Sequence, residues 1–157
     1  MKKPSQSTKA QKQGDTIRQW HLINLEQQIL GRVTSEIARL LQGKHKVGYV
    51  SYLDVGDHVV AINAAKVKLS GNKSQTKVYS RYSGFPGGQK RIVFAQAIKR
   101  NPQEVIRHAV SGMLPKNKLR AQRLTRLYIY KDEKHPYESM AKAKSPITSK
   151  DTAAGKK

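Results

Sequence analysis

Apolar positions in the first half of the chain follow two periods. A short β-leaning run at residues 20–25 (WHLINL) predicts a strand, and a continuous apolar run at 58–63 (HVVAIN) is typical of a strand buried on both faces of a sheet. Between them, apolar residues recur at helical spacing: Leu30, Val33, Ile37, Leu40 and Leu41. Gly43 follows the last of these, where a left-handed residue ends a helix. A strand, a helix and a second strand are therefore expected in this order.

The second half continues the alternation. Residues 78–82 predict a strand, the run GFPGG at 84–88 predicts a loop, and residues 92–100 predict a helix. Asn101, Pro102 and Glu104 have the spacing of a helix start, with Asn at the cap. The helix keeps one apolar face until Pro115, formed by Val105, Ile106, Ala109, Val110, Met113 and Leu114. With a last short strand at 127–130, the pattern favours a small α/β fold with a largely parallel sheet.

The two ends of the chain lack such periodicity. Residues 1–18 and 139–157 are rich in Lys, Ser and Thr and carry no periodic apolar face. Segments of this kind bury too little apolar surface to offset the entropy of ordering them. We therefore expect a flexible basic extension at 1–18, one folded domain at 19–138 and a flexible Lys-rich tail at 139–157.

Composition narrows the class of protein. The 157 residues include 31 Lys and Arg against 10 Asp and Glu, a net charge of +21, and no Cys. The absence of Cys excludes a disulfide scaffold, a zinc ribbon and a thiol nucleophile. No apolar run is long enough to span a bilayer, and no secretory signal pattern is present, so a cytoplasmic protein is expected.

The positive charge belongs to the predicted domain. Residues 85–126 hold ten Lys and Arg and a single acid, Glu104. A solvated surface usually mixes both signs, so a one-sign excess indicates a polyanionic partner, of which RNA or DNA is the commonest. An anionic membrane is disfavoured, because no helix joins these cations to a strong Trp, Phe and Leu face.

Residues with catalytic or metal-binding potential give no enzyme signature. The chain has no G-x-G-x-x-G, Walker or G-x-S-x-G motif, and its five His residues show no metal-ligand spacing. Asp54 and Asp57 are the only close acidic pair within residues 19–131. They would hold Mg²⁺ in a nuclease or shape the turn before the second strand, and the turn is the better interpretation. We therefore predict no catalytic residue, no metal and no cofactor.

Four motifs in unbroken order resemble large-subunit ribosomal protein thirteen, in its bacterial or organellar form. They are LGRVTSEIARLLQGKHK at 30–46, DVGDHVVAINAAKVKLSGNK at 54–73, YSGFPGG at 82–88 and HAVSGMLPKNKL at 108–119, and the similarity spans about 20–136. The resemblance implies a three-layer α/β/α domain that binds large-subunit rRNA, supports early subunit assembly, contacts neighbouring ribosomal proteins and has no catalytic activity. Arg120 and the pair Lys131-Asp132 stand where the family usually has small residues.

Charge pattern and resemblance together predict an RNA-binding surface. Its expected members are Lys44, His45, Lys46, Lys73, Lys77, Arg81, Gly87, Gly88, Lys90, Arg91, Lys99, Arg100, Lys116, Asn117, Lys118, Arg120 and Arg123. Gly87 and Gly88 form either a tight loop or a stretch without side chains that a phosphodiester backbone can approach. Basic residues at three-residue steps after Pro115 would follow a phosphate chain, and this segment is expected to contribute most of the affinity.

Alternative functions remain at this point. We expect the chain in cytoplasmic ribosomes, and an organellar ribosome is the second choice. We expect no membrane partner and no small-molecule substrate. A free RNA-binding translational regulator, including one that binds its own message, has the same sequence features. A metal-dependent nuclease built on Asp54 and Asp57 is the third hypothesis.

Overall fold

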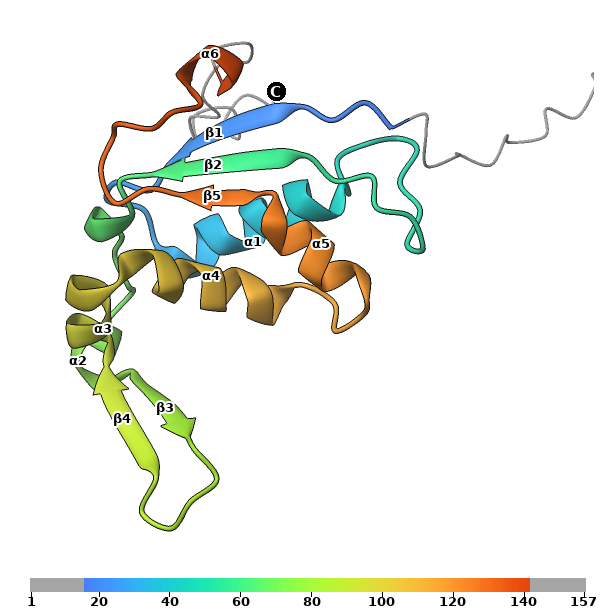
Figure 1. The fold of residues 1–157 in the computed structure, drawn as a ribbon. Helices are drawn as coiled ribbons and strands as arrows, with labels where there is room; N and C mark the ends of the chain where they lie inside the picture. The colour runs from blue at the N-terminus through green and yellow to red at the C-terminus, as the bar shows by residue number, and fades with distance from the viewer. Residues whose placement is uncertain (1–15, 142–157) are drawn as a thin grey trace, which may run out of the picture.

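A computed structural model describes residues 16–141 of the chain. In chain order the strands and helices are β1 (Trp20–Asn24), α1 (Leu30–Gln42), β2 (His58–Ile62), a 3₁₀ turn (Ala64–Lys66), α2 (Lys73–Thr76), β3 (Val78–Tyr82), β4 (Gln89–Val93), α3 (Phe94–Arg100), α4 (Pro102–Met113), α5 (Leu119–Thr125), β5 (Leu127–Ile129) and α6 (Glu138–Ala141). Two units are visible in Figure 1: a body built on β1, β2 and β5, and an arm formed by β3 and β4.

The body is a three-stranded parallel sheet with β2 in the middle. Trp20 lies opposite His58 in the β1–β2 pair, and Val59 lies opposite Leu127 in the β2–β5 pair. Helices α1, α4 and α5 cover one face of this sheet (Figure 1). The core lies between them, because alternate strand residues such as Ile23 and Ala61 pack against apolar residues of α1 and α4 such as Ile37 and Ile106. The α/β class and the small parallel sheet are confirmed.

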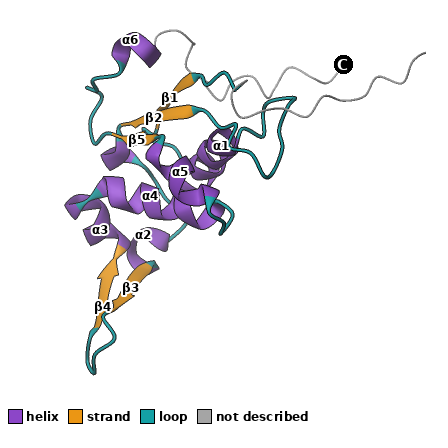
Figure 2. Ribbon diagram, turned by 45° about the vertical axis from the view of Figure 1, so that its right-hand side comes forward, coloured by secondary structure: helices purple, strands orange, loops and turns teal. Residues whose placement is uncertain are grey.

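Aromatic rings cover much of the opposite face. Trp20 stacks on His58 with ring centroids 4.4 Å apart and on Tyr137 at 5.0 Å, and Tyr128 lies beside them. The four-residue helix α6 lies next to β1 on this side (Figure 2). The third layer of the predicted three-layer arrangement is therefore thin, and consists of α6 and the segment that leads to it.

Helix ends agree with the sequence pattern. Gly43 has φ of 79° and its N–H donates to the carbonyls of Arg39 and Leu40, as expected of a left-handed helix end. The side chain of Asn101 accepts a hydrogen bond from the Glu104 N–H and so caps α4. One position of the predicted apolar face is wrong: Met113 is exposed, because α4 ends there and the buried residue is Leu114.

Two further expectations need comment. The helix predicted at 92–100 begins only at Phe94, because Ile92 and Val93 belong to β4, a strand that the sequence pattern did not indicate. The flexible tails expected at 1–18 and 139–157 fall mainly on residues 1–15 and 142–157, which lie outside the described residues. In the described part of the first tail, the Ile17 carbonyl accepts a hydrogen bond from Lys46.

Candidate nucleic-acid interface

The arm is a two-stranded antiparallel hairpin that points away from the body (Figures 1 and 2). Most of its side chains are exposed on both faces, so it has little apolar core of its own. Arg81 lies directly opposite Lys90 in the register, and Ser80 lies opposite Arg91. Like charges at facing positions destabilise a hairpin, and no acid occurs anywhere between Asp57 and Glu104 to offset them. The arm therefore presents cations without a counter-charge.

The tip of the arm is a tight loop with exposed rings. The Gly88 N–H donates to the Phe85 carbonyl, and a Cβ on Gly88 would lie 2.1 Å from the Ser83 hydroxyl oxygen. Gly87 has φ of 71°, a conformation that favours glycine. Both glycines are thus explained by the turn itself, while Tyr82 and Phe85 are largely exposed beside the cations. Exposed rings next to cations are the usual combination on surfaces that contact unpaired bases.

The root of the arm is fixed to the body by a few specific contacts. Tyr79 meets the His108 ring of α4 edge to face at 5.7 Å, and the Lys77 ammonium lies 5.5 Å from the centre of the Tyr79 ring. Phe94 is buried and donates its N–H to the Lys77 carbonyl. Three further predicted residues, Lys73, Lys99 and Arg100, are exposed in α2 and α3 near this root. The structure thus brings seven of the predicted cations to one arm and its root.

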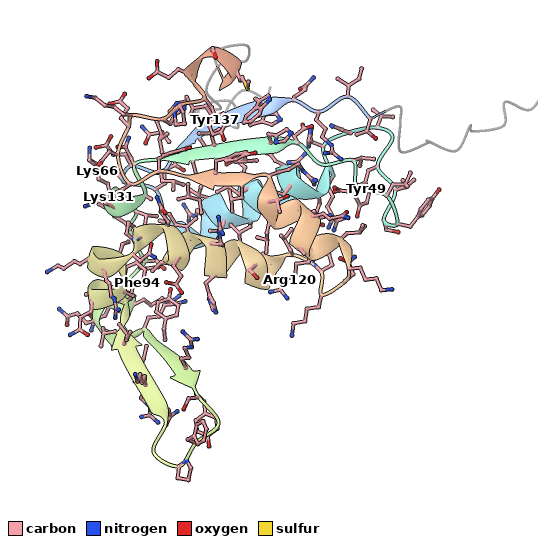
Figure 3. All side chains as sticks on the ribbon, in the orientation of Figure 1. Tyr49, Lys66, Phe94, Arg120, Lys131 and Tyr137 are labelled. Carbon is pink, nitrogen blue, oxygen red and sulfur yellow. The ribbon has the colours of Figure 1, made fainter. Side chains whose placement is uncertain are left out.

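The basic segment after Pro115 divides into two parts. Lys116, Asn117 and Lys118 are exposed, and the Arg120 guanidinium donates to the Ser111 hydroxyl of α4 (Figure 3). Arg123, however, is 1% exposed and lies with its Nε atom 3.7 Å from Asp54. Its expected role in direct RNA binding does not fit this position. The physical reason is the helix period of α5, since three residues turn a helix by about 300° and not by a full turn.

The segment after α1 also turns inward. Asp57 is fully buried, and its carboxylate accepts hydrogen bonds from His21 and His45, both at 2.8 Å, and from the Gln19 N–H at 3.0 Å. The Lys46 ammonium lies 2.5 Å from the same carboxylate and also donates to the Val55 carbonyl. Three basic residues of this segment were expected on the RNA surface. Only Lys44 is exposed, because the side chains of His45 and Lys46 bind the Asp57 carboxylate.

The surroundings of Asp57 and His45 shift the pKa values of both groups. Burial alone would raise the pKa of Asp57, but hydrogen bonds from His21, Lys46 and the Gln19 N–H hold this pKa well below its usual range. Burial lowers the pKa of His45, and this outweighs the attraction of Asp57. Ligand atoms of His21, His45 and Asp57 lie within 4.8 Å of one another, which the sequence spacing did not predict. Because the Lys46 ammonium already binds the carboxylate, we interpret the group as an ionic network and not as a metal centre.

Asp54 is the centre of a second network. Arg126 binds it with two parallel contacts, one of 2.6 Å from Nη2 to Oδ1, and Arg18 and Arg123 lie at 3.7 Å. Both members of the acidic pair are thus engaged by cations of other segments, Asp57 by Lys46 and Asp54 by Arg126, and not by the turn that the sequence predicted. Nothing in the sequence spacing indicated these partners, which lie as much as 72 positions away.

Fold and surface together define a small basic α/β protein with one group of exposed cations on an arm and another after the end of α4. The family model described as Ribosomal protein L13 matches residues 18–136, so the chain belongs to the ribosomal protein L13 family. The resemblance seen in the sequence is confirmed.

Curated relatives agree with this assignment. The chain is 46% identical over 128 residues to the large ribosomal subunit protein uL13 of Kocuria rhizophila, which covers 82% of this chain and 87% of the relative. It is 45% identical over 130 residues to the protein of the same name from Roseiflexus sp., with 83% and 89% covered. For that from Desulfitobacterium hafniense the identity is 47% over 122 residues, with 78% and 85% covered. These relatives are named as ribosomal proteins and not as enzymes. No helix in the described part of the chain is long and apolar enough to cross a membrane.

Proposed function

We propose that this chain is a structural constituent of the large ribosomal subunit that binds large-subunit rRNA and supports early subunit assembly. The observation that carries the proposal is the arm: Arg81 faces Lys90 across the hairpin, Arg91 adjoins them, and no acid lies within the segment between Asp57 and Glu104. Phosphate groups supply the missing negative charge. The uL13 name of the relatives supports the large subunit as the setting.

The proposed contact surface comprises three parts. The arm and its root contribute Lys73, Lys77, Arg81, Lys90, Arg91, Lys99 and Arg100, with the backbone of Gly87 and Gly88 at the tip. The end of α4 and the start of α5 contribute Lys116, Asn117, Lys118 and Arg120. The third part is Lys44, which is exposed just after α1. Phosphate neutralisation by these residues releases condensed counterions and allows RNA helices to pack around the protein.

The test compares two triple variants. Arg81→Gln, Lys90→Gln and Arg91→Gln remove the cations of the arm, whereas Lys66→Gln, Lys131→Gln and Lys134→Gln remove three exposed cations beside Glu26, Asp132 and Glu133. Binding to large-subunit rRNA free of other proteins is measured by filter binding over a range of salt. The arm variant should flatten the slope of log K against log salt by up to about 3, since each lost phosphate contact removes about 1.

Three results decide the matter. Equal slopes for both triple variants, each folded by circular dichroism, would remove the arm from the RNA surface. Failure of the wild-type chain to bind rRNA until other ribosomal proteins are present would contradict the early assembly role. Loss of the chain from large subunits washed in high salt would favour a free RNA-binding regulator instead.

A further inference from the structure

A pocket of about 440 Å³ lies at the end of the sheet where β2 and β5 begin. His58 and Tyr128 line it from the two strands, and Gln122 and Thr125 line it from α5. The pocket is part of the Asp54 network, because Arg18, Arg126 and the Asp54 carboxylate itself complete its wall. Figure 1 shows the arm leaving the body near the opposite end of the sheet, so the pocket is separate from the arm, although α5 links it to the basic residues that begin that helix.

The wall of the pocket carries more positive than negative charge. Asp54 is the carboxylate of every ion pair that Arg18, Arg123 and Arg126 form within the described residues. One carboxylate balances one guanidinium, so the network retains two positive charges. Asp57 does not supply the difference, because Lys46 binds it at 2.5 Å. An uncompensated buried cation is costly, and an anion in the pocket would offset that cost.

Hydrogen-bond donors in this network also lack partners. Among the described residues, no group accepts from the buried Nε of Arg126 or from Nε and Nη2 of Arg123. Arg126 is only 5% exposed, and Arg123 only 1%. Buried polar groups are nearly always paired, and leaving them unpaired is expensive. These donors are buried and Arg123 does not line the pocket, so they add positive charge behind its wall and do not reach into it. The guanidinium that a ligand can reach is that of the partly exposed Arg18, and guanidinium groups pair with carboxylate and phosphate in a fork geometry.

His58 lies in the field of the same two arginines. Burial lowers the pKa of His58, and the charges of Arg126 and Arg18 lower it further, against a smaller opposing effect of Asp57. Trp20 stacks on this ring from β1, and Tyr128 lies 6.2 Å away on β5. The imidazole therefore lies beside rings of both neighbouring strands and within the field of Arg18 and Arg126. An anion is the class of ligand that this environment favours.

We propose that this pocket binds a phosphate group, and that in the assembled particle this phosphate belongs to the backbone of large-subunit rRNA, a part that rests on the proposed function. Arg18 and Arg126 carry the positive charge that attracts it, and Gln122 and Thr125 offer polar contacts at the rim. A cavity of about 440 Å³ has room for a phosphate with part of its sugar. The pocket would then add a phosphate contact to the three parts of the surface proposed above.

The first experiment uses inorganic phosphate and the full chain. Phosphate is titrated at constant ionic strength against chloride, and amide resonances are followed by NMR. Saturable shifts are expected for Gln122, Thr125 and Arg126 and not for the arm residue Arg91. Uniform weak shifts at all exposed cations, or no saturation in the pocket, would overturn the phosphate site.

Matched charge variants sharpen this result. Gln122→Glu places a negative charge at an exposed position of the pocket rim, so it should weaken phosphate binding by about tenfold, the effect of roughly one unit charge at short range. Gln103→Glu makes the same change at an exposed position of α4 away from the pocket and should leave the affinity within about twofold. Arg18→Gln provides a second variant, because Arg18 is exposed enough for the fold to tolerate its loss. Equal affinities for all four proteins would overturn the site.

Binding to large-subunit rRNA identifies the source of the phosphate. If the phosphate belongs to RNA, Gln122→Glu should reduce the slope of log K against log salt by about 1 relative to Gln103→Glu. Phosphate binding in the pocket with an unchanged rRNA slope would overturn the RNA assignment and indicate a small phosphorylated ligand. Failure of the wild-type chain to bind rRNA, with the phosphate shifts retained, would refute the proposed function and leave the pocket as a phosphate site.

Discussion

The arm and the amino end of the sheet use the same kinds of side chain in opposite ways. At the sheet end, arginines, a lysine and two histidines surround Asp54 and Asp57, which are nearly or fully buried. On the arm, Arg81, Lys90 and Arg91 are exposed and have no acid nearby in sequence. The first set of cations is paired within the fold, and the second set faces no acid across the hairpin. Net charge alone therefore does not indicate which basic residues meet a partner.

The strongest contrast between the two regions should come from Gly56→Ala. A Cβ at Gly56 would lie 1.8 Å from the Leu41 carbonyl oxygen, so the loop before β2 cannot pass the end of α1 unless the backbone moves. We expect a loss of more than about 4 kcal/mol in unfolding free energy, or a chain that does not fold. Urea unfolding measures it, with Gly112→Ala as control. That helical glycine has open space around it, and the change should stabilise by roughly 0.5–1 kcal/mol.

Asp57→Asn should be the next largest effect. The change removes the charge that His21, His45 and Lys46 share, and leaves a partly buried ammonium without its counter-ion. Removing one partner of a buried ion pair costs about 3–5 kcal/mol. Asp132→Asn, at an exposed position, should lie within about 0.5 kcal/mol of the wild type in the same urea measurement. A loss below about 1 kcal/mol for Asp57→Asn would mean that the network is not what holds this end of the sheet.

Arg123→Gln should separate the buried part of the basic segment from its exposed part. Because Arg123 is among the largest fully buried side chains, the shorter Gln leaves a cavity, and we expect a loss of about 1–3 kcal/mol in unfolding free energy from lost packing. Lys118→Gln, five positions earlier and exposed, should change stability by less than about 0.5 kcal/mol. Thermal unfolding followed by circular dichroism is the measurement. Equal melting temperatures for the two variants would contradict a structural role for Arg123 and support the exposed position that the sequence pattern predicts.

The smallest effect on stability should come from the arm itself. Arg81→Gln with Lys90→Gln removes facing like charges, so the free protein should be unchanged or more stable by roughly 0.2–1 kcal/mol. Differential scanning calorimetry at low salt, where the repulsion is strongest, gives the clearest reading. A clear loss of stability would show that these cations have structural partners, and the contrast between arm and body would fail.

Much of the body could be predicted from local pattern. The periods of two and of 3.6, the glycine after α1 and the Asn cap of α4 place most of its strands and helices. Strand β4 could not be found in this way, because Gln89, Lys90 and Arg91 are polar and exposed and only the pairing with β3 makes them a strand. The partners of Asp54 could not be predicted from the sequence either, because Arg126 is 72 positions away and only the fold brings it near.

The arm also affects the solubility of the protein before it binds any partner. In the described part of the chain β3 and β4 form a sheet of two strands, so both are edge strands with backbone groups free to pair with another chain. Such edges promote aggregation, and charged side chains, lysine above all, are the common protection. Arg81, Lys90 and Arg91 repel an incoming copy of the same hairpin. The charges proposed to bind RNA would thus also keep the newly made chain soluble until it is assembled.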